Sequence, residues 1–346
     1  MISKNFWKNK NVMVTGHSGF KGMWLSLVLK HFDAKVTGLS LENVNSDIYK
    51  SLNSKKFFEK EYFLDLSQDI NNLNEEIFSE NKFDIIFHFA AQPLVSTASL
   101  DPLGTLKTNI FGTFNLIEMI ITHNTTSVLV VATTDKVYKY SENMNDENAH
   151  LGGIEFYSSS KVGQEMIVEA FKNSEKNKNL HISTVRSGNV LGPGDGASDR
   201  LMTDLTNSLK RDKDIILRNP NSIRPWQDIL DSIDGYLLVA KRNYDLNKGD
   251  IFNLNSEMNN ETTTREIVES MIKKWNSKIK ITVVESDFHE SFKLRIDSSK
   301  ANQILGWKSK LNIEDILDKI VEWEKNEKNI DLEDVSFDQI KTYYSI

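Results

Sequence analysis

Short apolar runs alternate with helical periodicity through the first half of the chain. The apolar runs predict strands at Val12–Thr15, Lys35–Ser40, Phe63–Leu66, Asp84–Phe89, Ser127–Ala132 and His181–Val185. Apolar positions at helical spacing predict helices over about 20–32, 103–122 and 157–173. Strands that alternate with helices in this way predict an α/β fold with a parallel, doubly wound sheet.

The alternation loosens after Gly192-Pro193-Gly194. The pattern there predicts helices over about 199–210, 231–241, 264–276 and 312–325, and strands at Ile215–Leu217, Ile251–Leu254 and Ile279–Val284. We therefore expect a sheet domain over 1–185 and a smaller C-terminal α/β domain, which binds substrate, over 186–346. Some later elements are expected to cross back to the sheet, and Ile251–Leu254 is a candidate.

Three glycines follow the first predicted strand at a spacing of three, at Gly16, Gly19 and Gly22. Gly16 permits a tight turn from strand to helix, Gly19 lets the backbone approach a pyrophosphate, and Gly22 lets helix and strand pack closely. The free N–H groups and the dipole at the helix N-terminus attract phosphates. This context favours dinucleotide binding over a plain turn and makes the predicted sheet Rossmann-type.

The end of the second predicted strand bears on the choice of cofactor. A dinucleotide fold often places an acid there to bind the adenosine ribose. Here the strand ends at Ser40, Glu42 comes two residues late, and no arginine is nearby to bind a 2′-phosphate. The missing cation favours NAD over NADP.

The amino-acid composition excludes several classes of binding partner and functional site. A net charge of −7 and a pI near 5.6 argue against a general nucleic-acid binder and against binding to an anionic membrane. Cysteine is absent, so disulfides, thiol nucleophiles and cysteine metal sites are excluded, and the seven histidines lack ligand spacing. With no signal-peptide or membrane-span pattern, we expect a cytoplasmic protein, and we expect no metal site.

Tyr157 and Lys161 stand four residues apart in a predicted helix, which places both on one face. A nearby cation is expected to stabilise the phenolate and lower the tyrosine pKa, making it a base near neutral pH. Taken alone, the pair is more often a surface feature. Because a glycine-rich dinucleotide-binding turn lies upstream, we interpret Tyr157 and Lys161 as a catalytic pair.

These pieces together resemble the extended short-chain dehydrogenase/reductase superfamily, many of whose members act on nucleotide sugars. The matching motifs are Gly16–Gly22, Phe89-Ala90-Ala91, Asn109 in Asn-Ile-Phe-Gly-Thr, Thr133–Tyr138, Tyr157 with Lys161, and Arg186–Val190. Further signatures look most like the CDP-glucose 4,6-dehydratase family. They are Phe6-Trp7-Lys8, Ala91-Gln92-Pro93-Leu94-Val95, Thr134-Asp135-Lys136, Gly188–Asp195, Asp199-Arg200-Leu201, Arg218-Asn219-Pro220, Arg224–Gln227, Leu305-Gly306-Trp307 and Glu322-Trp323.

The resemblance implies three sets of site residues. The catalytic set is Thr134, Asp135, Lys136, Tyr157 and Lys161. NAD is expected to contact Gly16, His17, Ser18, Gly19, Phe20, Lys21, Gly22, Asp65, Leu66, Phe89, Ala90, Ala91, Gln92, Asn109, Tyr157 and Lys161. The CDP-glucose substrate is expected to contact Gln92, Thr134, Asn189, Arg200, Arg218, Arg224 and Lys293. Arginine suits the diphosphate because its planar fork binds phosphate oxygens in pairs.

The resemblance also implies the reaction. Tyr157 takes the O4 proton while hydride passes from C4 to NAD, the 4-keto group acidifies C5, and water is lost across C5–C6 before hydride returns to C6. Asp135 serves as the acid if burial raises its pKa. Lys136 is the C5 base if its pKa is lowered; its alternative role is electrostatic.

Several alternatives stay open on the sequence. One is a nucleotide-sugar 4-epimerase or a dehydratase for another nucleotide, and a different class is a redox-silent NAD-binding regulatory protein. The resemblance further implies a homodimer, in which the helix over about 105–122 and the helix that carries Tyr157 form a four-helix bundle with a second copy.

Overall fold

The computed structural model describes residues 4–42, 46–68, 76–177, 179–259, 261–284, 295–326 and 331–345. Its centre is a seven-stranded sheet in the order β10-β6-β5-β4-β1-β2-β3, and all six pairings are parallel. The strands are β1 Asn11–Thr15, β2 Lys35–Ser40, β3 Lys60–Phe63, β4 Ile85–His88, β5 Val128–Ala132, β6 His181–Ser187 and β10 Ile251–Leu254. The order reverses between β1 and β4, which marks the crevice where such sheets bind ligands.

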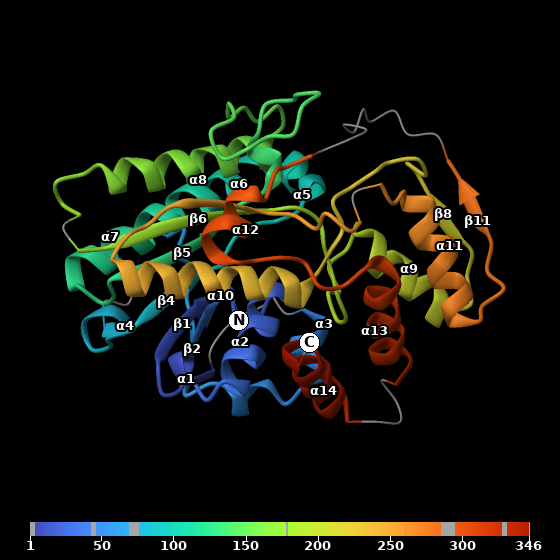
Figure 1. Cartoon of the computed structure of the whole chain (residues 1–346), viewed down its shortest axis with the longest axis horizontal. Coiled ribbons are helices and arrows are strands. Elements are labelled where there is room, and N and C mark those ends of the chain that lie inside the picture. Colours follow the sequence, from blue (N-terminus) through green and yellow to red (C-terminus); the bar gives the residue numbers. More distant parts are fainter. Residues whose placement is uncertain are drawn as a thin grey trace.

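Helices cover both faces of the sheet (Figure 1). The helices α7 Gly112–His123 and α8 Phe156–Lys172 lie on one face, and α2 Phe20–His31 and α10 Ile229–Leu246 lie on the other. A second lobe beside the sheet holds α9 Leu201–Lys210, α11 Thr264–Trp275, α13 Ile313–Asn326 and the parallel pair β8 Ile215–Leu217 with β11 Ile281–Val283. The short pair β7 Val190–Leu191 with β9 Gln227–Asp228 is also parallel. The doubly wound α/β fold that the sequence predicts is therefore confirmed.

The central strands are apolar without interruption because both of their faces are buried. Along β1, Val12 and Val14 belong to the core that packs under α2 and α10, while Met13 belongs to the core on the other face. The same alternation runs along β5, where Val128 and Val130 face one core and Leu129 and Val131 face the other. In β1, β4 and β5, polar side chains are thereby confined to the strand ends.

Some boundaries differ from the sequence predictions. The strand expected at Phe63–Leu66 lies earlier, at Lys60–Phe63, because the Asp65 carboxylate starts a turn by accepting bonds from the backbone N–H and the hydroxyl of Ser67. The helix expected over 103–122 is α6 Pro102–Leu106, a π-helical turn Lys107–Phe111 and then α7.

The C-terminal part contains elements that the hydrophobic pattern did not indicate. These are α12 Ser299–Leu305 and α14 Leu332–Ser345, which packs against α2 and α13. The Tyr343 hydroxyl donates to the Asp231 carboxylate at 2.8 Å and ties α14 to α10. The remaining short helices are α1 Lys4–Trp7, α3 Asp47–Ser51, α4 Glu76–Ser79, α5 Val95–Leu100 and the 3₁₀ turns Ser54–Phe57 and Asp135–Val137.

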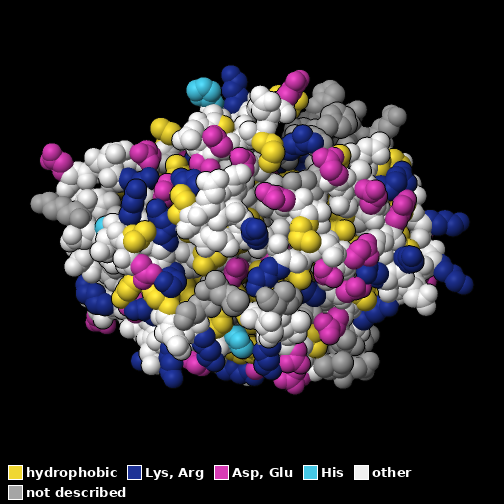
Figure 2. All heavy atoms as spheres, in the orientation of Figure 1, with side chains coloured by type: hydrophobic (Ala, Val, Ile, Leu, Met, Phe, Trp, Pro, Cys, Tyr) yellow, Lys and Arg dark blue, Asp and Glu magenta, His cyan; other side chains and the backbone are white. Residues whose placement is uncertain are grey.

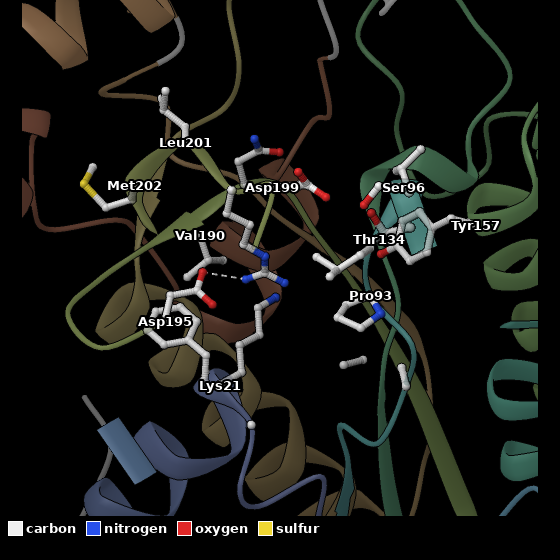
Figure 3. Close-up of a pocket in the computed structure, with 18 of the residues that line it drawn as sticks. Lys21, Pro93, Ser96, Thr134, Tyr157, Val190, Asp195, Asp199, Leu201 and Met202 are labelled. Carbon is white, nitrogen blue, oxygen red and sulfur yellow. Dashed lines mark hydrogen bonds and ion pairs between the residues drawn. The ribbon is translucent and has the colours of Figure 1, made fainter. Parts of the chain in front are cut away.

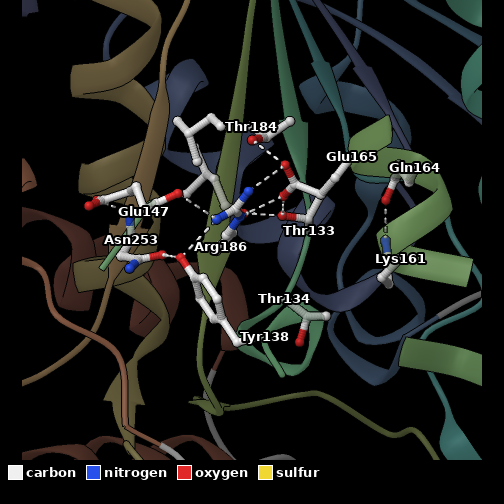
Figure 4. A network of polar contacts seen from close by, with 12 residues as sticks. Thr133, Thr134, Tyr138, Glu147, Lys161, Gln164, Glu165, Thr184, Arg186 and Asn253 are labelled. Atoms are coloured by element: carbon white, nitrogen blue, oxygen red, sulfur yellow. Dashed lines mark hydrogen bonds and ion pairs between the residues drawn. The ribbon is translucent and has the colours of Figure 1, made fainter. Parts of the chain in front are cut away.

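A buried ion pair joins α8 to β6 (Figure 4). Arg186 donates through Nε and Nη2 to the two carboxylate oxygens of Glu165, each at 3.0 Å. The same carboxylate accepts from the hydroxyls of Thr133 at 2.6 Å and Thr184 at 2.9 Å. Arg186 also donates to the Tyr138 hydroxyl, so the pair fixes the loop after β5 as well as helix α8.

Glu165→Gln should lower the free energy of unfolding by about 3–5 kcal/mol, because it leaves the buried guanidinium without its counter-ion. The measurement is urea unfolding at neutral pH. Glu169→Gln is the control on the same helix, since its pair with Lys172 at 3.1 Å is more exposed and should contribute less than about 1 kcal/mol. Equal losses in the two variants would contradict the structural role of the buried pair.

Candidate active site

A cavity of about 1300 Å³ opens at the carboxyl ends of the central strands and extends into the second lobe (Figure 3). It is larger than a typical site for one small ligand. Of the predicted residues, its walls include Gly16, Ser18, Gly19, Phe20, Lys21, Gly22, Asp65, Leu66, Phe89, Ala90, Ala91, Thr134, Asp135, Lys136, Tyr157, Lys161, Asn189, Arg200, Arg218 and Arg224.

The glycine-rich turn requires glycine for steric reasons. Gly16 has φ +72°, and a Cβ there would lie 2.7 Å from the backbone nitrogen of Ala90. A Cβ on Gly22 would lie 2.1 Å from the carbonyl oxygen of Gly16. Gly19 precedes the first turn of α2 and offers no side-chain cap, so the N-terminal amides of α2 face the cavity without a competing side chain. The turn therefore fits an anionic ligand.

Three predicted residues turn their side chains away from the cavity. His17 is fully buried and its Nε2 lies 2.9 Å from the Glu61 carboxylate. The Gln92 amide bonds to the backbone of Leu94 and to Thr105, and Asn109 bonds to the Gln92 backbone and the Ser160 hydroxyl. Lys293 lies outside the described residues.

Tyr157 stands in the first turn of α8, which begins with a capping box. The Glu155 carboxylate accepts from the backbone N–H groups of Tyr157 and Ser158, and the Ser158 hydroxyl accepts from the Glu155 backbone. The Tyr157 phenol is buried and lies close to Thr134 (Figure 3), and burial raises the pKa of this phenol to about 12. The predicted lowering by a nearby cation is wrong for this structure, because desolvation of the phenolate outweighs the charges around it.

Lys161 lies one turn further along α8 and is also buried. Its ammonium donates to the Ala132 carbonyl at 3.2 Å and to Oε1 of Gln164 at 2.9 Å. Burial and, after it, the positive charge of Lys21 lower the pKa of Lys161 to about 7, against the opposing effect of Glu165. Near neutral pH this lysine can therefore gain or lose a proton.

Asp135 and Lys136 follow β5 in a 3₁₀ turn whose N-cap is Thr134. The Thr134 hydroxyl donates to Oδ1 of Asp135 at 3.0 Å, while Oδ2 has no hydrogen-bond partner although it is buried. Burial raises the pKa of the Asp135 carboxyl; the charge of Lys136 and the bond from Thr134 oppose this rise. The turn therefore presents a carboxyl that tends to hold its proton and that accepts a hydrogen bond from Thr134, close to Tyr157.

Cations gather at the wall opposite Tyr157. Arg200 pairs with Asp195 at 2.7 Å, and Figure 3 shows Lys21 beside this pair with its side chain directed into the cavity. Burial, followed by the charge of Arg200, lowers the pKa of Lys21 to about 8. Arg218 and Arg224 also line the cavity, and the charge of Arg224 acts on Asp135. Lys21, expected at the cofactor, thus lies also toward the second lobe.

The cavity walls include residues to which the sequence assigned no role. Ser96 of α5 lies near Thr134 and Tyr157, and Asp195 and Asp199 lie near Arg200 (Figure 3). Asp195 belongs to the quoted Gly-Pro-Gly-Asp motif, so a signal was present, but its pairing with Arg200 needs the fold. Among the residues that the structure describes, no cluster of histidine and carboxylate side chains has the arrangement of a metal site. In the same part of the chain, no helix is both long and apolar enough to cross a bilayer.

Comparisons with known proteins agree with this geometry. A model of the GDP-mannose 4,6 dehydratase family matches residues 13–320. The CDP-glucose 4,6-dehydratase of Salmonella typhimurium is 37% identical over 339 residues, which cover 94% of this chain and 93% of that protein. The dTDP-D-glucose 4,6-dehydratase of Mus musculus is 26% identical and covers 91% of this chain and 88% of its own length.

Solved structures share the fold at low identity. MoeE5 in complex with UDP-glucose and NAD has a TM-score of 0.79 at 18% identity and covers 91% of this chain and 99% of its own. The UDP-glucose 4-epimerase of Thermotoga maritima has a TM-score of 0.80 at 22% identity, with coverage of 91% and 99%.

Fold, glycine-rich turn and the Tyr157–Lys161 pair define an extended short-chain dehydrogenase/reductase of the epimerase and dehydratase type. More narrowly, the chain belongs to the nucleotide-sugar 4,6-dehydratase family.

The depressed pKa of Lys161 predicts a pH-dependent stability. Its folded-state pKa is about 7 against an ordinary value of 10.5, so between these values the unfolded chain binds more protons and the unfolding free energy rises with pH. Relative to Lys161→Met, the wild type should therefore gain stability from about pH 7 to pH 9, by up to about 1.4 kcal/mol per pH unit. Urea unfolding of both proteins across this range measures the difference. A constant or falling difference would contradict a lysine that titrates near neutrality.

Proposed function

We propose that this protein is an NAD-dependent CDP-glucose 4,6-dehydratase, which converts CDP-D-glucose to CDP-4-dehydro-6-deoxy-D-glucose and water. The observation that carries this proposal is the cavity wall at which Tyr157 lies close to Thr134, whose hydroxyl donates to the buried carboxyl of Asp135. It joins a group for C4 oxidation to a carboxyl that retains its proton, which is what elimination of a hydroxyl needs. The 37% identical relative supports cytidine as the nucleotide.

The cavity fits a dinucleotide at its sheet end. Gly16–Gly22 receives the pyrophosphate in this proposal, while Ser40, Leu41, Asp65 and Leu66 line the far end for the adenosine. Neither Ser40 nor Leu41 is charged, so nothing in that pair selects a 2′-phosphate, which supports NAD. NAD, when bound, accepts a hydride from the sugar and later returns it, and its pyridinium ring brings a positive charge into the cavity.

Tyr157 begins the proposed reaction as the phenolate, which the positive charge of bound NAD would favour against the effect of burial, and it accepts the O4 proton as C4 becomes a ketone. The ketone acidifies the C5–H bond, and Lys136, in its neutral amine form, removes that proton. Asp135 donates its proton to the C6 hydroxyl, which leaves as water while a C5–C6 double bond forms. Hydride then adds to C6 and a proton to C5, so the product differs from the substrate only by one water.

The substrate diphosphate meets the arginines of the second lobe in this proposal. Arg200, Arg218 and Arg224 line the cavity, as does Asn189, the residue before β7. When substrate binds, Arg200 exchanges its Asp195 partner for the phosphate group. Two phosphate oxygens can then accept hydrogen bonds from the guanidinium in parallel.

A homodimer through α6, α7 and α8 completes the proposal. Apolar side chains remain half exposed along these helices: Leu103, Phe111, Phe114, Phe156 and Met166. Helix α8 contacts both α6 and α7, and the π-helical turn that carries Phe111 contacts all three helices, so these side chains form a surface that a second copy can cover.

Mass spectrometry tests the reaction and the nucleotide together. Incubation with NAD and, in parallel, CDP-, UDP-, GDP- and dTDP-glucose should remove one water from CDP-glucose. Tyr157→Phe should lower this turnover by at least about a hundredfold while NAD binding stays near that of the wild type, because only the proton acceptor is lost. Loss of water from only one of the other nucleotide sugars would keep the proposed reaction but change the proposed nucleotide specificity. No mass change would leave a 4-epimerase or a redox-silent NAD-binding protein, and retained turnover in Tyr157→Phe would reject the tyrosine as base.

Asp135→Asn should still permit C4 oxidation but slow the loss of water by about a hundredfold or more, since the amide cannot donate the carboxyl proton. Reduced nicotinamide should then accumulate, which absorbance measures in a single turnover. Lys136→Ala is the companion variant and should block incorporation of solvent deuterium at C5. Failure of Asp135→Asn at the first step, or full activity of Lys136→Ala, would contradict this division of roles.

A further inference from the structure

Lys161 stands at one end of a buried hydrogen-bonded chain that crosses from α8 to the centre of the sheet. Its acceptor Gln164 donates through Nε2 to the Thr113 hydroxyl of α7 at 2.7 Å. That hydroxyl lies 2.9 Å from Nε2 of His88 at the end of β4, and His88 Nδ1 lies 2.7 Å from the Thr15 hydroxyl of β1. His88, Thr113 and Gln164 are each buried, with at most 1% of their surface exposed.

One arrangement of protons satisfies every member of this chain. The Thr113 hydroxyl donates to the Asn109 carbonyl at 2.8 Å, so its oxygen accepts from both Gln164 and His88. His88 then carries its proton on Nε2, and its Nδ1 accepts from the Thr15 hydroxyl. Thr15 in turn accepts from the backbone N–H of Ala90 at 3.3 Å.

This arrangement fixes which end of the Gln164 amide faces Lys161. Because the amide nitrogen is held by Thr113, Oε1 is directed at the ammonium. A flipped amide would place its NH₂ group against a cation and leave the Thr113 oxygen without that donor. The Thr113 hydroxyl is two hydrogen bonds away from Lys161. Its removal thus permits the flipped orientation of the Gln164 amide, in which the NH₂ group faces the positive charge of Lys161.

We propose that His88, Thr113 and Gln164 are positioning residues that hold the Lys161 ammonium in the orientation it needs beside Tyr157. This inference rests on the proposed function, since it assigns to Lys161 its part in oxidation at C4. Gln164 contacts Lys161 directly, whereas Thr113 and His88 act through it.

The titratable groups around Lys161 come from three elements, α2, α8 and β4. Lys21 of α2 opposes its protonation, Glu165 of α8 favours it, and His88 of β4 interacts with it electrostatically. Tyr157 also belongs to α8, one turn before Lys161. Burial and the charge of Lys161 lower the pKa of His88 to about 3, so this imidazole stays neutral at any pH where the protein is assayed.

Thr113→Val tests the chain, because valine keeps the shape and removes the hydroxyl. Turnover number should fall about ten- to hundredfold with KM for the nucleotide sugar within about twofold, and the alkaline limb of the rate profile should move to lower pH. Thr113→Ser should restore both. Thr126→Val removes another buried hydroxyl, at the amino end of β5, and should leave both unchanged. Equal effects in Thr126→Val, or an unshifted profile in Thr113→Val, would overturn the proposal.

A second measurement does not need turnover. Nitrogen-15 NMR of the imidazoles, assigned with His88→Gln, should show His88 neutral with its proton on Nε2 between about pH 5 and pH 8. Carbon-13 titration of the Lys161 side chain, assigned with Lys161→Met, should show it losing its proton at lower pH in Thr113→Val. A proton on Nδ1, a protonated ring or an unchanged Lys161 titration would overturn the proposal. An enzyme inactive on every nucleotide sugar but with these signals would instead contradict the proposed function alone.

Discussion

Burial of the central strands on both faces is the constraint on which the rest of the structure depends. Because β1, β4 and β5 alternate apolar side chains between two cores, no polar group can stand in the middle of the sheet without a partner. The reacting groups are therefore collected at the carboxyl ends of the strands, where Gly16 begins the phosphate-binding turn and Thr134–Lys136 follows β5. The cavity lies where the strand order reverses, since helices diverge there to opposite faces.

Two of the buried polar systems in this interior hold α8. The Arg186–Glu165 pair fixes the helix from the side of β6, and the His88–Thr113–Gln164 chain reaches it from the side of β4. Tyr157 and Lys161 lie on the same helix. Each system is costly to bury and stable only when its donors and acceptors are matched, so together they give the helix one position and the two catalytic side chains one orientation.

Desolvation is the common cause of the unusual electrostatics in the cavity. It raises the pKa of Asp135 and of Tyr157, and it lowers the pKa of Lys161 and Lys21. All four groups are thereby shifted toward their neutral forms, so that an incoming charge changes their protonation readily. Burying ionisable groups in a cavity lowers the folding stability of the protein. In return, the cavity contains groups that exchange protons near neutral pH.

The sequence by itself determined the order of strands and helices, the glycine turn and the Tyr157–Lys161 spacing, because these follow from local periodicity and from contacts within one helix or turn. It misplaced β3, where the Asp65 turn overrides an apolar run, and it did not indicate α14, whose position depends on Asp231 and Tyr343 from distant parts of the chain. Only the tertiary structure decided that the phenol pKa rises, that His17 and Asn109 turn inward, and that Lys21 meets Arg200 and Asp195. Burial and long-range contacts set these properties, and neither is encoded in the spacing of residues along the chain.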